Sequence, residues 1–163
     1  MTTNPLSPKI PAFLAAWSLL GCAAEPAPVA ADDPAAEACE HLTDGPAQAV
    51  VAKTTSVAAE LADVSKSHTR FDVTLPADAS GTYAGYVKFL APTAGGYLLV
   101  ANALVPMQVL DSGGSALVPV STVVASACPA AKTQLELMFG ISTYRVKIGP
   151  ISQAVVGLLF EAK

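Results

Sequence analysis

The sequence predicts an all-β protein, an antiparallel β-sandwich of jelly-roll or immunoglobulin-like type with about eight or nine strands. Three observations lead to this prediction. From residue 68 onward apolar and polar residues alternate with a period of two, which is typical of strands that bury one face. Turn-forming residues interrupt the runs at short intervals, as at 111–114 and 149–150. The chain of 163 residues has room for one ordinary domain, and none for the crossover helices of a parallel α/β fold.

The clearest alternation lies in residues 68–75. Phe71, Val73 and Leu75 share one face of this predicted strand, and His68 lies on the opposite, polar face. Two further alternating strands and six apolar runs complete the set: 132–139, 142–148, 48–54, 83–91, 97–104, 107–110, 116–125 and 153–160. Residues 57–66 are the only stretch compatible with a helix, and a loop is the alternative there.

The N-terminus is typical of an export signal. Residues 10–21 form an uncharged apolar run that follows Lys9. This length fits the hydrophobic region of a secretory signal and is too short to span a bilayer as a helix.

The end of this run resembles the lipobox of bacterial lipoproteins. Leu19, Gly21 and Cys22 match that pattern. The resemblance implies that Cys22 is diacylated, becomes the mature N-terminus and anchors the protein in a membrane, since several acyl chains hold a protein stably. The residue after Cys22 is Ala23 and not Asp, so the resemblance to the sorting pattern of Gram-negative bacteria implies the outer membrane.

The next segment is expected to be a flexible tether. Residues 23–38 contain eight Ala, three Pro, four acidic residues and no basic ones, and such a composition cannot bury enough apolar area to offset its ordering entropy. The predicted organisation is therefore a signal peptide at 1–21, a lipidated Cys with its tether at 22–38, and a β-sandwich domain at 39–163.

Cys39 and Cys128 remain once Cys22 is assigned to the lipid. An exported protein enters an oxidising compartment, so these two residues are predicted to form a disulfide. The bridge would close a loop of about 90 residues, for which chain entropy gives about 4.5 kcal/mol. A thiol-based active site is the alternative, but the chain has no C-x-x-C and no His close to Cys128 in sequence.

Several strand-and-turn phrases resemble the pre-peptidase C-terminal type of bacterial secreted β-sandwich. These phrases are residues 86–89 with 94–97, residues 107–114, and residues 135–146. The resemblance covers roughly 69–148 and implies a β-sandwich. The chain lacks that family's preceding protease domain and its richer set of acidic residues, so no calcium or targeting role is carried over.

The composition and motifs exclude several functions. A net charge of -4 argues against a nucleic-acid partner, and no hydrolase, metalloprotease, phosphate-loop or EF-hand motif is present. We therefore expect a non-enzymatic, lipid-anchored envelope protein without a cofactor, acting as a binding or structural module. An envelope protein or a glycan is a possible ligand, and the sequence does not choose between them.

The alternative function is periplasmic transition-metal binding. His41 and His68 are the only histidines, and with Glu40 they would suit a transition metal if the disulfide brings them together. The sequence predicts His68 on a regular strand and His41 in an irregular lead-in, and nothing in it requires that they converge. The expectation is therefore weak binding of zinc or copper at most, whereas imidazoles within about 4 Å of each other would favour the metal-binding function.

Overall fold

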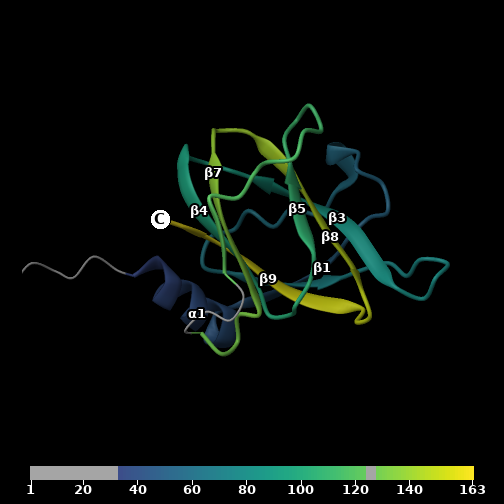
Figure 1. The fold of residues 1–163 in the computed structure, drawn as a ribbon, viewed down its shortest axis with the longest axis horizontal. Coiled ribbons are helices and arrows are strands. Elements are labelled where there is room, and N and C mark those ends of the chain that lie inside the picture. The colour runs from purple at the N-terminus through teal and green to yellow at the C-terminus, as the bar shows by residue number, and fades with distance from the viewer. Residues whose placement is uncertain (1–32, 124–127) are drawn as a thin grey trace, which may run out of the picture. The chain divides into compact units, whose positions relative to one another are not determined.

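The fold of this protein is a β-sandwich, as the sequence predicts (Figure 1). The computed structural model describes residues 33–123 and 128–163, so the predicted signal peptide and Cys22 lie outside the described residues. One sheet has six strands in the order β1(Ala47–Val51), β2(Arg70–Thr74), β9(Val155–Ala162), β4(Gly95–Ala101), β7(Thr133–Phe139) and β6(Ser121–Val123). The other has three, in the order β3(Tyr83–Leu90), β8(Thr143–Ile151) and β5(Met107–Leu110). All neighbours are antiparallel except β1 and β2, which are parallel.

The main core lies between the two sheets. The alternation predicted for residues 68–75 is confirmed for Phe71, Val73 and Leu75, which are all buried. An aromatic cluster fills one part of this core, where Phe89 of β3 stacks on Phe160 of β9 with ring centroids 3.9 Å apart. Together these contacts join the small sheet to the centre of the large one.

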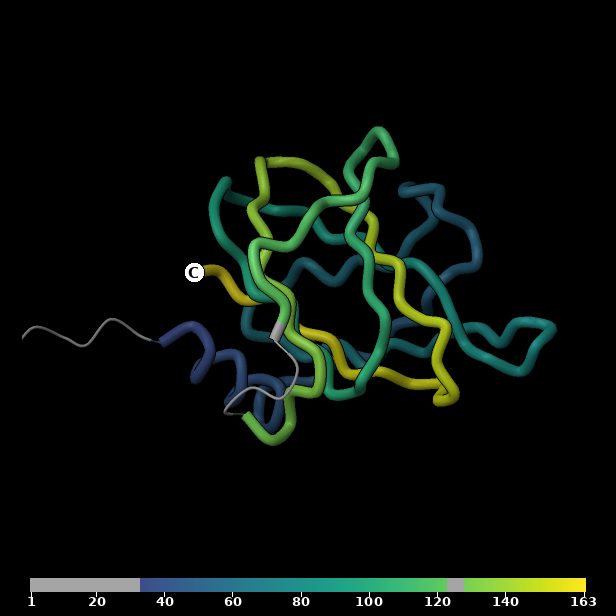
Figure 2. The backbone as a smooth tube through the Cα atoms, in the orientation of Figure 1, coloured from purple at the N-terminus to yellow at the C-terminus, as the bar shows by residue number. Residues whose placement is uncertain are grey.

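A helix covers the outer face of the six-stranded sheet. Helix α1(Pro34–Asp44) packs Ala38 and Leu42 against Leu98, Val100 and Leu159 of β4 and β9. These two strands are therefore buried on both faces. The tube in Figure 2 shows α1 lying beside the C-terminal strand. No helix in the described part of the chain is long and apolar enough to cross a membrane.

The prediction of a tether over residues 23–38 was wrong at its C-terminal end. Helix α1 begins at Pro34, so residues 34–38 belong to the helix and not to the tether. Asp33 caps the helix by accepting a hydrogen bond from the Ala35 amide, and Pro34 occupies the first turn, where its missing N–H costs nothing. For residues 57–66, where the sequence left a helix or a loop open, the structure has a loop that contains the short 3₁₀ turn η1(Ala58–Glu60).

Two strand boundaries also differ from expectation. Strand β2 begins at Arg70, so His68 lies in the turn before the strand and not on its polar face. The predicted strand at 116–125 is a strand only over Ser121–Val123, and residues 124–127 lie outside the described residues.

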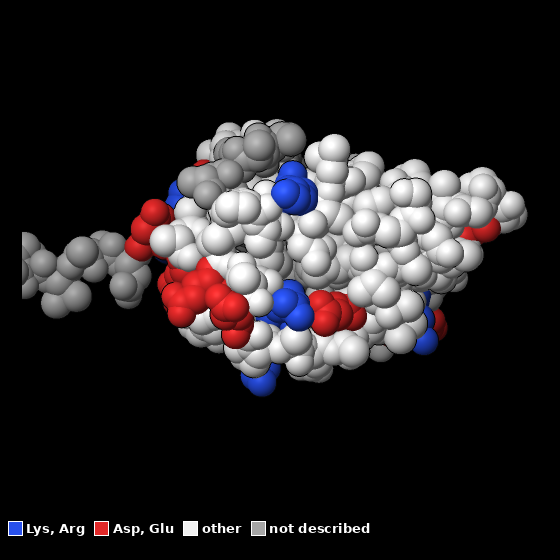
Figure 3. All heavy atoms as spheres, turned by 90° about the horizontal axis from the view of Figure 1, so that it is seen from below, with Lys and Arg blue, Asp and Glu red and all other residues white. Residues whose placement is uncertain are grey.

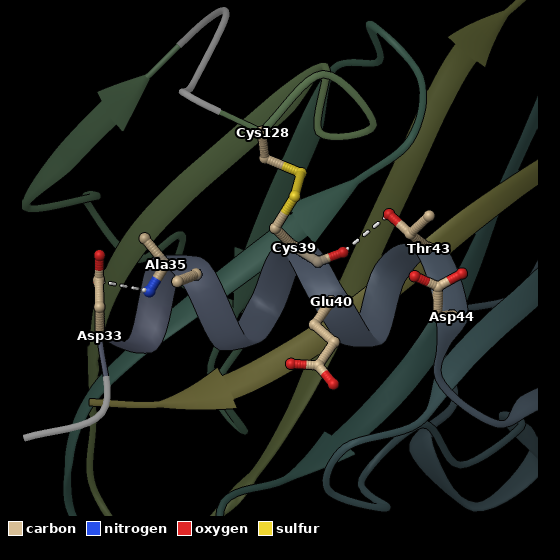
Figure 4. A pocket seen from close by; sticks show the side chains of 8 residues that line it. Asp33, Ala35, Cys39, Glu40, Thr43, Asp44 and Cys128 are labelled. Carbon is tan, nitrogen blue, oxygen red and sulfur yellow. Dashed lines mark hydrogen bonds between the residues drawn. A yellow bond between two sulfur atoms is a disulfide. The ribbon is translucent and has the colours of Figure 1, made fainter.

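The predicted disulfide joins Cys39 of α1 to Cys128 (Figure 4). The Cα atoms are 5.5 Å apart and the residues are separated by 89 positions in sequence. Cys128 lies shortly before β7, so the bridge fastens the middle of α1 to the six-stranded sheet.

Candidate metal centre

The two histidines of the chain meet at the end of the six-stranded sheet. Nδ1 of His68 lies 3.0 Å from Nε2 of His41, and the ring centroids are 4.7 Å apart. His41 comes from the second half of α1 and His68 from the turn before β2. The convergence that the sequence left open is therefore present.

Glu37 lies one helical turn before His41, so both side chains project from the same face of α1. Its Oε1 is 3.5 Å from Nε2 of His41 and 3.1 Å from Nδ1 of His68. The carboxylate thus reaches both imidazoles. Glu40, which the sequence analysis had grouped with the histidines, is not part of this cluster.

Glu161 of β9 completes the group from the sheet. It lies on the outer face of the sheet, two residues after Leu159, and is only 4% exposed. Its Oε1 is 3.4 Å from Nδ1 of His68. Its Oε2 is buried and accepts no hydrogen bond from any described residue. A buried carboxylate oxygen without a partner is costly, which marks this position as a site that an ion or a donor would stabilise.

The pKa of Glu161 is raised above its ordinary value, chiefly because burial disfavours the charged form. The neighbouring His68 lowers it, the Glu37 carboxylate raises it, and His41 lowers it. Among the described residues, no Lys or Arg forms an ion pair with Glu37 or Glu161. The two carboxylates therefore have only imidazoles as counter-charges.

The spacing of the four groups suits a metal ion. One ligand atom from each of Glu37, His41, His68 and Glu161 lies within 4.8 Å of the others. Ligands about 2.0–2.2 Å from a tetrahedral zinc lie about 3.3–3.6 Å from one another. The separations of 3.0, 3.1, 3.4 and 3.5 Å given above are close to that range. The side chains would need to move only slightly to coordinate one ion.

His68 has an unusual backbone conformation. Its φ is 51°, and it is the one non-glycine residue with a positive φ in the described part of the chain. The left-handed region costs an L-residue about 1–2 kcal/mol, and such outliers cluster at functional sites. In this conformation the imidazole lies between Glu37 and His41 of α1 and Glu161 of β9.

The helix is held in register with this turn by Arg70. Its guanidinium donates hydrogen bonds to the carbonyl oxygens of Leu42 at 3.2 Å and Thr43 at 3.4 Å, in the last turn of α1. The same side chain pairs with Asp72 of its own strand at 3.0 Å. Because Arg70 is two residues after His68, these contacts fix the distance between the two histidine-bearing segments.

The surface around α1 is acidic. The helix and its cap carry Asp33, Glu37, Glu40 and Asp44 and no Lys or Arg. Figure 3 shows acidic side chains gathered over this end of the molecule. Such a field attracts cations towards the four-residue cluster.

A different cavity lies on the other side of the helix. It has a volume of about 460 Å³ and is lined by the disulfide, Glu40 and neighbouring residues of α1 (Figure 4). Glu40 points away from the disulfide there and is exposed. This cavity contains no imidazole, so we assign it no chemistry.

Sequence reasoning identified the two histidines but missed both carboxylates of the cluster. Glu37 could have been found from its spacing of four residues to His41, had 34–44 been recognised as a helix. Glu161 could have been noticed as a lone charge in the apolar run of the last strand. Neither of these sequence features predicts that Glu37 and Glu161 lie close together in the fold.

Comparison with known proteins adds no assignment. No protein-family model matches the chain, and no curated protein is similar to it.

Proposed function

We propose that this protein is an exported, lipid-anchored binding protein for a divalent transition metal, with zinc as the best-suited ion. The observation that carries this proposal is the convergence of Glu37, His41 and His68 on the buried Glu161, whose second oxygen has no partner among the described residues. The proposal keeps the expectation of a non-enzymatic binding module and names its ligand.

The ligand chemistry favours a divalent metal of intermediate softness. Two imidazole nitrogens and two carboxylate oxygens suit Zn²⁺, Ni²⁺ or Cu²⁺. Ca²⁺ and Mg²⁺ prefer sites built from oxygen alone. Cu⁺ prefers thiolate and thioether sulfur, and the two described cysteines are joined in a disulfide. Two carboxylates also balance the charge of a divalent ion, which favours binding at a partly buried position.

Calorimetric titration of the full-length mature protein with zinc tests this function. We expect one equivalent of Zn²⁺ to bind with a Kd of about 1 μM or lower. His41→Ala and His68→Ala should each weaken binding at least tenfold, and so should Glu161→Gln, which keeps the shape of the side chain and removes its charge.

Glu40→Gln is the matched control. It removes a carboxylate from the same helix, outside the cluster, and should leave the affinity unchanged. If the wild-type protein binds no zinc, or if all five proteins bind it equally, the proposed function is wrong.

The anchoring part of the proposal depends on Cys22 and has its own test. The lipobox resemblance supports acylation of Cys22 and outer-membrane localisation in a Gram-negative bacterium. Cys22→Ser should prevent lipid attachment, which intact-mass analysis and detergent partitioning would detect. An unmodified mature N-terminus at another residue would refute the anchor and leave the metal site untouched.

A further inference from the structure

A second cavity opens directly onto the proposed metal centre. It has a volume of about 320 Å³, and Glu37, His68 and Glu161 form part of its wall. His41 does not line it. Three of the four proposed ligands therefore face the cavity, and the fourth approaches from the helix side.

The remaining walls combine aromatic and hydroxyl groups. Phe89, Tyr97 and Phe160 belong to the aromatic cluster of the core and contribute apolar surface. Ser67 and Thr93 contribute hydroxyls at the exposed side of the cavity. An apolar wall with a few polar groups is the usual construction of a small-molecule site.

The cavity gives a further donor a route to the metal. The four ligand-atom separations given above are 3.0–3.5 Å, and all four ligand atoms lie within 4.8 Å of one another. A zinc site can expand from four ligands to five, and a fifth ligand would approach from the cavity, which three of the four proposed ligands line.

The charge of the site selects the class of that ligand. Two carboxylates already neutralise a divalent ion, and the surrounding surface of α1 is acidic. A further anion would make the centre negative in a negative field, which Coulomb repulsion disfavours. A neutral nitrogen donor carries no such penalty. An aromatic ring would contact the apolar wall, and its distal N–H could donate to a cavity hydroxyl, as metal-bound imidazoles usually do.

We propose that the cavity admits a neutral imidazole-type ligand, which takes an exchangeable coordination position on the metal held by Glu37, His41, His68 and Glu161. The ligand can be a free heterocycle or the side chain of an exposed histidine in a peptide. This inference rests on the proposed metal-binding function.

The test uses Co²⁺ as a spectroscopic substitute for zinc, because its visible absorption reports coordination number and ligand type. The Co²⁺-loaded full-length protein is titrated with imidazole, with an N- and C-blocked histidine peptide, and with acetate. We expect imidazole to change the spectrum saturably, and acetate at the same concentration to change it at least tenfold less. A response to the peptide as strong as that to imidazole would assign histidine side chains as ligands. A response to imidazole alone would assign the free heterocycle.

A cavity-filling variant provides the structural control. Ser67→Phe places a bulky ring in the wall without removing a metal ligand, and it should retain Co²⁺ while losing at least nine-tenths of the imidazole response. Ser112→Phe makes the same substitution at an exposed turn elsewhere and should behave as wild type.

The outcomes separate the two proposals. Co²⁺ binding with a spectrum that imidazole does not change would overturn this inference and leave the metal site standing. Acetate acting as strongly as imidazole, or an unaltered response in Ser67→Phe, would also overturn it. Failure of Co²⁺ and Zn²⁺ to bind at all would overturn both proposals.

Discussion

His68 combines a backbone strain with a position at the centre of the cluster. Its φ of 51° is a conformation that glycine adopts freely and histidine adopts at a cost. Nδ1 of His68 is also the atom that contacts His41, Glu37 and Glu161. Glycine or asparagine would adopt this conformation at a lower cost, so the strain at His68 is consistent with the proposed metal-binding role of its imidazole.

The backbone strain and the side-chain contacts of His68 together predict how His68→Gly changes stability with and without zinc. Without metal, the variant should be about as stable as the wild type, because relief of the backbone strain offsets the loss of the contacts that His68 makes with Glu37 and Glu161. With zinc at 100 times its Kd, the wild type should gain about 2.7 kcal/mol and the variant almost nothing. Thermal unfolding with and without zinc measures both effects.

Ser67→Gly is the control in the same turn, and it should keep the stabilisation by zinc. A His68→Gly protein that is clearly less stable without metal would instead show that the histidine has a structural role.

The carboxyl group of Asp78, in a loop remote from the cluster, should make the stability of the fold depend on pH in the acid range. Hydrogen bonds from the side chains of Ser80 and Thr82 stabilise its charged form and lower its pKa from 3.8 to about 2. A carboxyl group with a lowered folded-state pKa stabilises the fold above its unfolded pKa, and this contribution is lost as pH falls through about 2.

Carboxyl chemical shifts in an NMR titration should therefore give Asp78 a midpoint near 2. The amides of Ser80 and Thr82, which donate to the same carboxylate, should titrate with it. A midpoint near 3.8 would show that the loop does not hold these hydrogen bonds in solution.

At the scale of single residues, the sequence identified the histidines because a chain with only two of them leaves no other neutral-nitrogen ligand. Glu40 was grouped with the histidines as a possible metal ligand because it is adjacent to His41 in sequence. On a helix, adjacent residues are about 100° apart, whereas residues four apart are neighbours, so Glu37 takes that place. The wrong carboxylate follows from the unrecognised helix.

Among the elements, the candidate site depends most on α1, since this helix carries both Glu37 and His41. Its Asp33 cap, the apolar contacts of Ala38 and Leu42, and the Cys39 disulfide hold it on the sheet. A helix of 11 residues is marginal in isolation, so these tertiary contacts supply most of its stability.

Replacing both Cys39 and Cys128 by Ala should therefore have two effects. The unfolding free energy should fall by about 4.5 kcal/mol, which lowers the Tm by about 10 °C or more. Zinc affinity should fall at least tenfold, because the helix loses its covalent attachment to the sheet and is held less firmly by its remaining contacts. Thermal unfolding and calorimetry below the new Tm measure these effects separately.

Double replacement by Ala avoids new thiol ligands, which would bind zinc themselves. Unchanged zinc affinity in the folded double variant would show that the disulfide contributes stability without positioning the site.

Most strands were predictable and the helix was not, for physical reasons. In β7, the alternation of Leu135, Leu137 and Phe139 directly reflects burial of one face. The helix has a composition of Ala, Pro and acidic residues that also suits a disordered tether. Its folding depends on the outer face of β4 and β9 and on Cys128, all of which lie more than 50 residues away in sequence.

For the whole molecule, the candidate site exists only because the sandwich brings three distant segments together. Residues 37–41, residue 68 and residue 161 meet where α1 crosses the end of the six-stranded sheet. The β-sandwich itself follows from local alternation. The meeting point depends on strand order, with β9 between β2 and β4, and strand order cannot be inferred from alternation in a single sequence.

A crystal structure of the zinc-loaded protein, with anomalous diffraction at the zinc edge, tests the central claim most directly. We predict one strong anomalous peak, about 2.0–2.2 Å from a nitrogen of His41, a nitrogen of His68 and carboxylate oxygens of Glu37 and Glu161. A zinc ion bound elsewhere, or no ordered zinc at saturating concentration, would contradict the claim that these four residues form a metal centre.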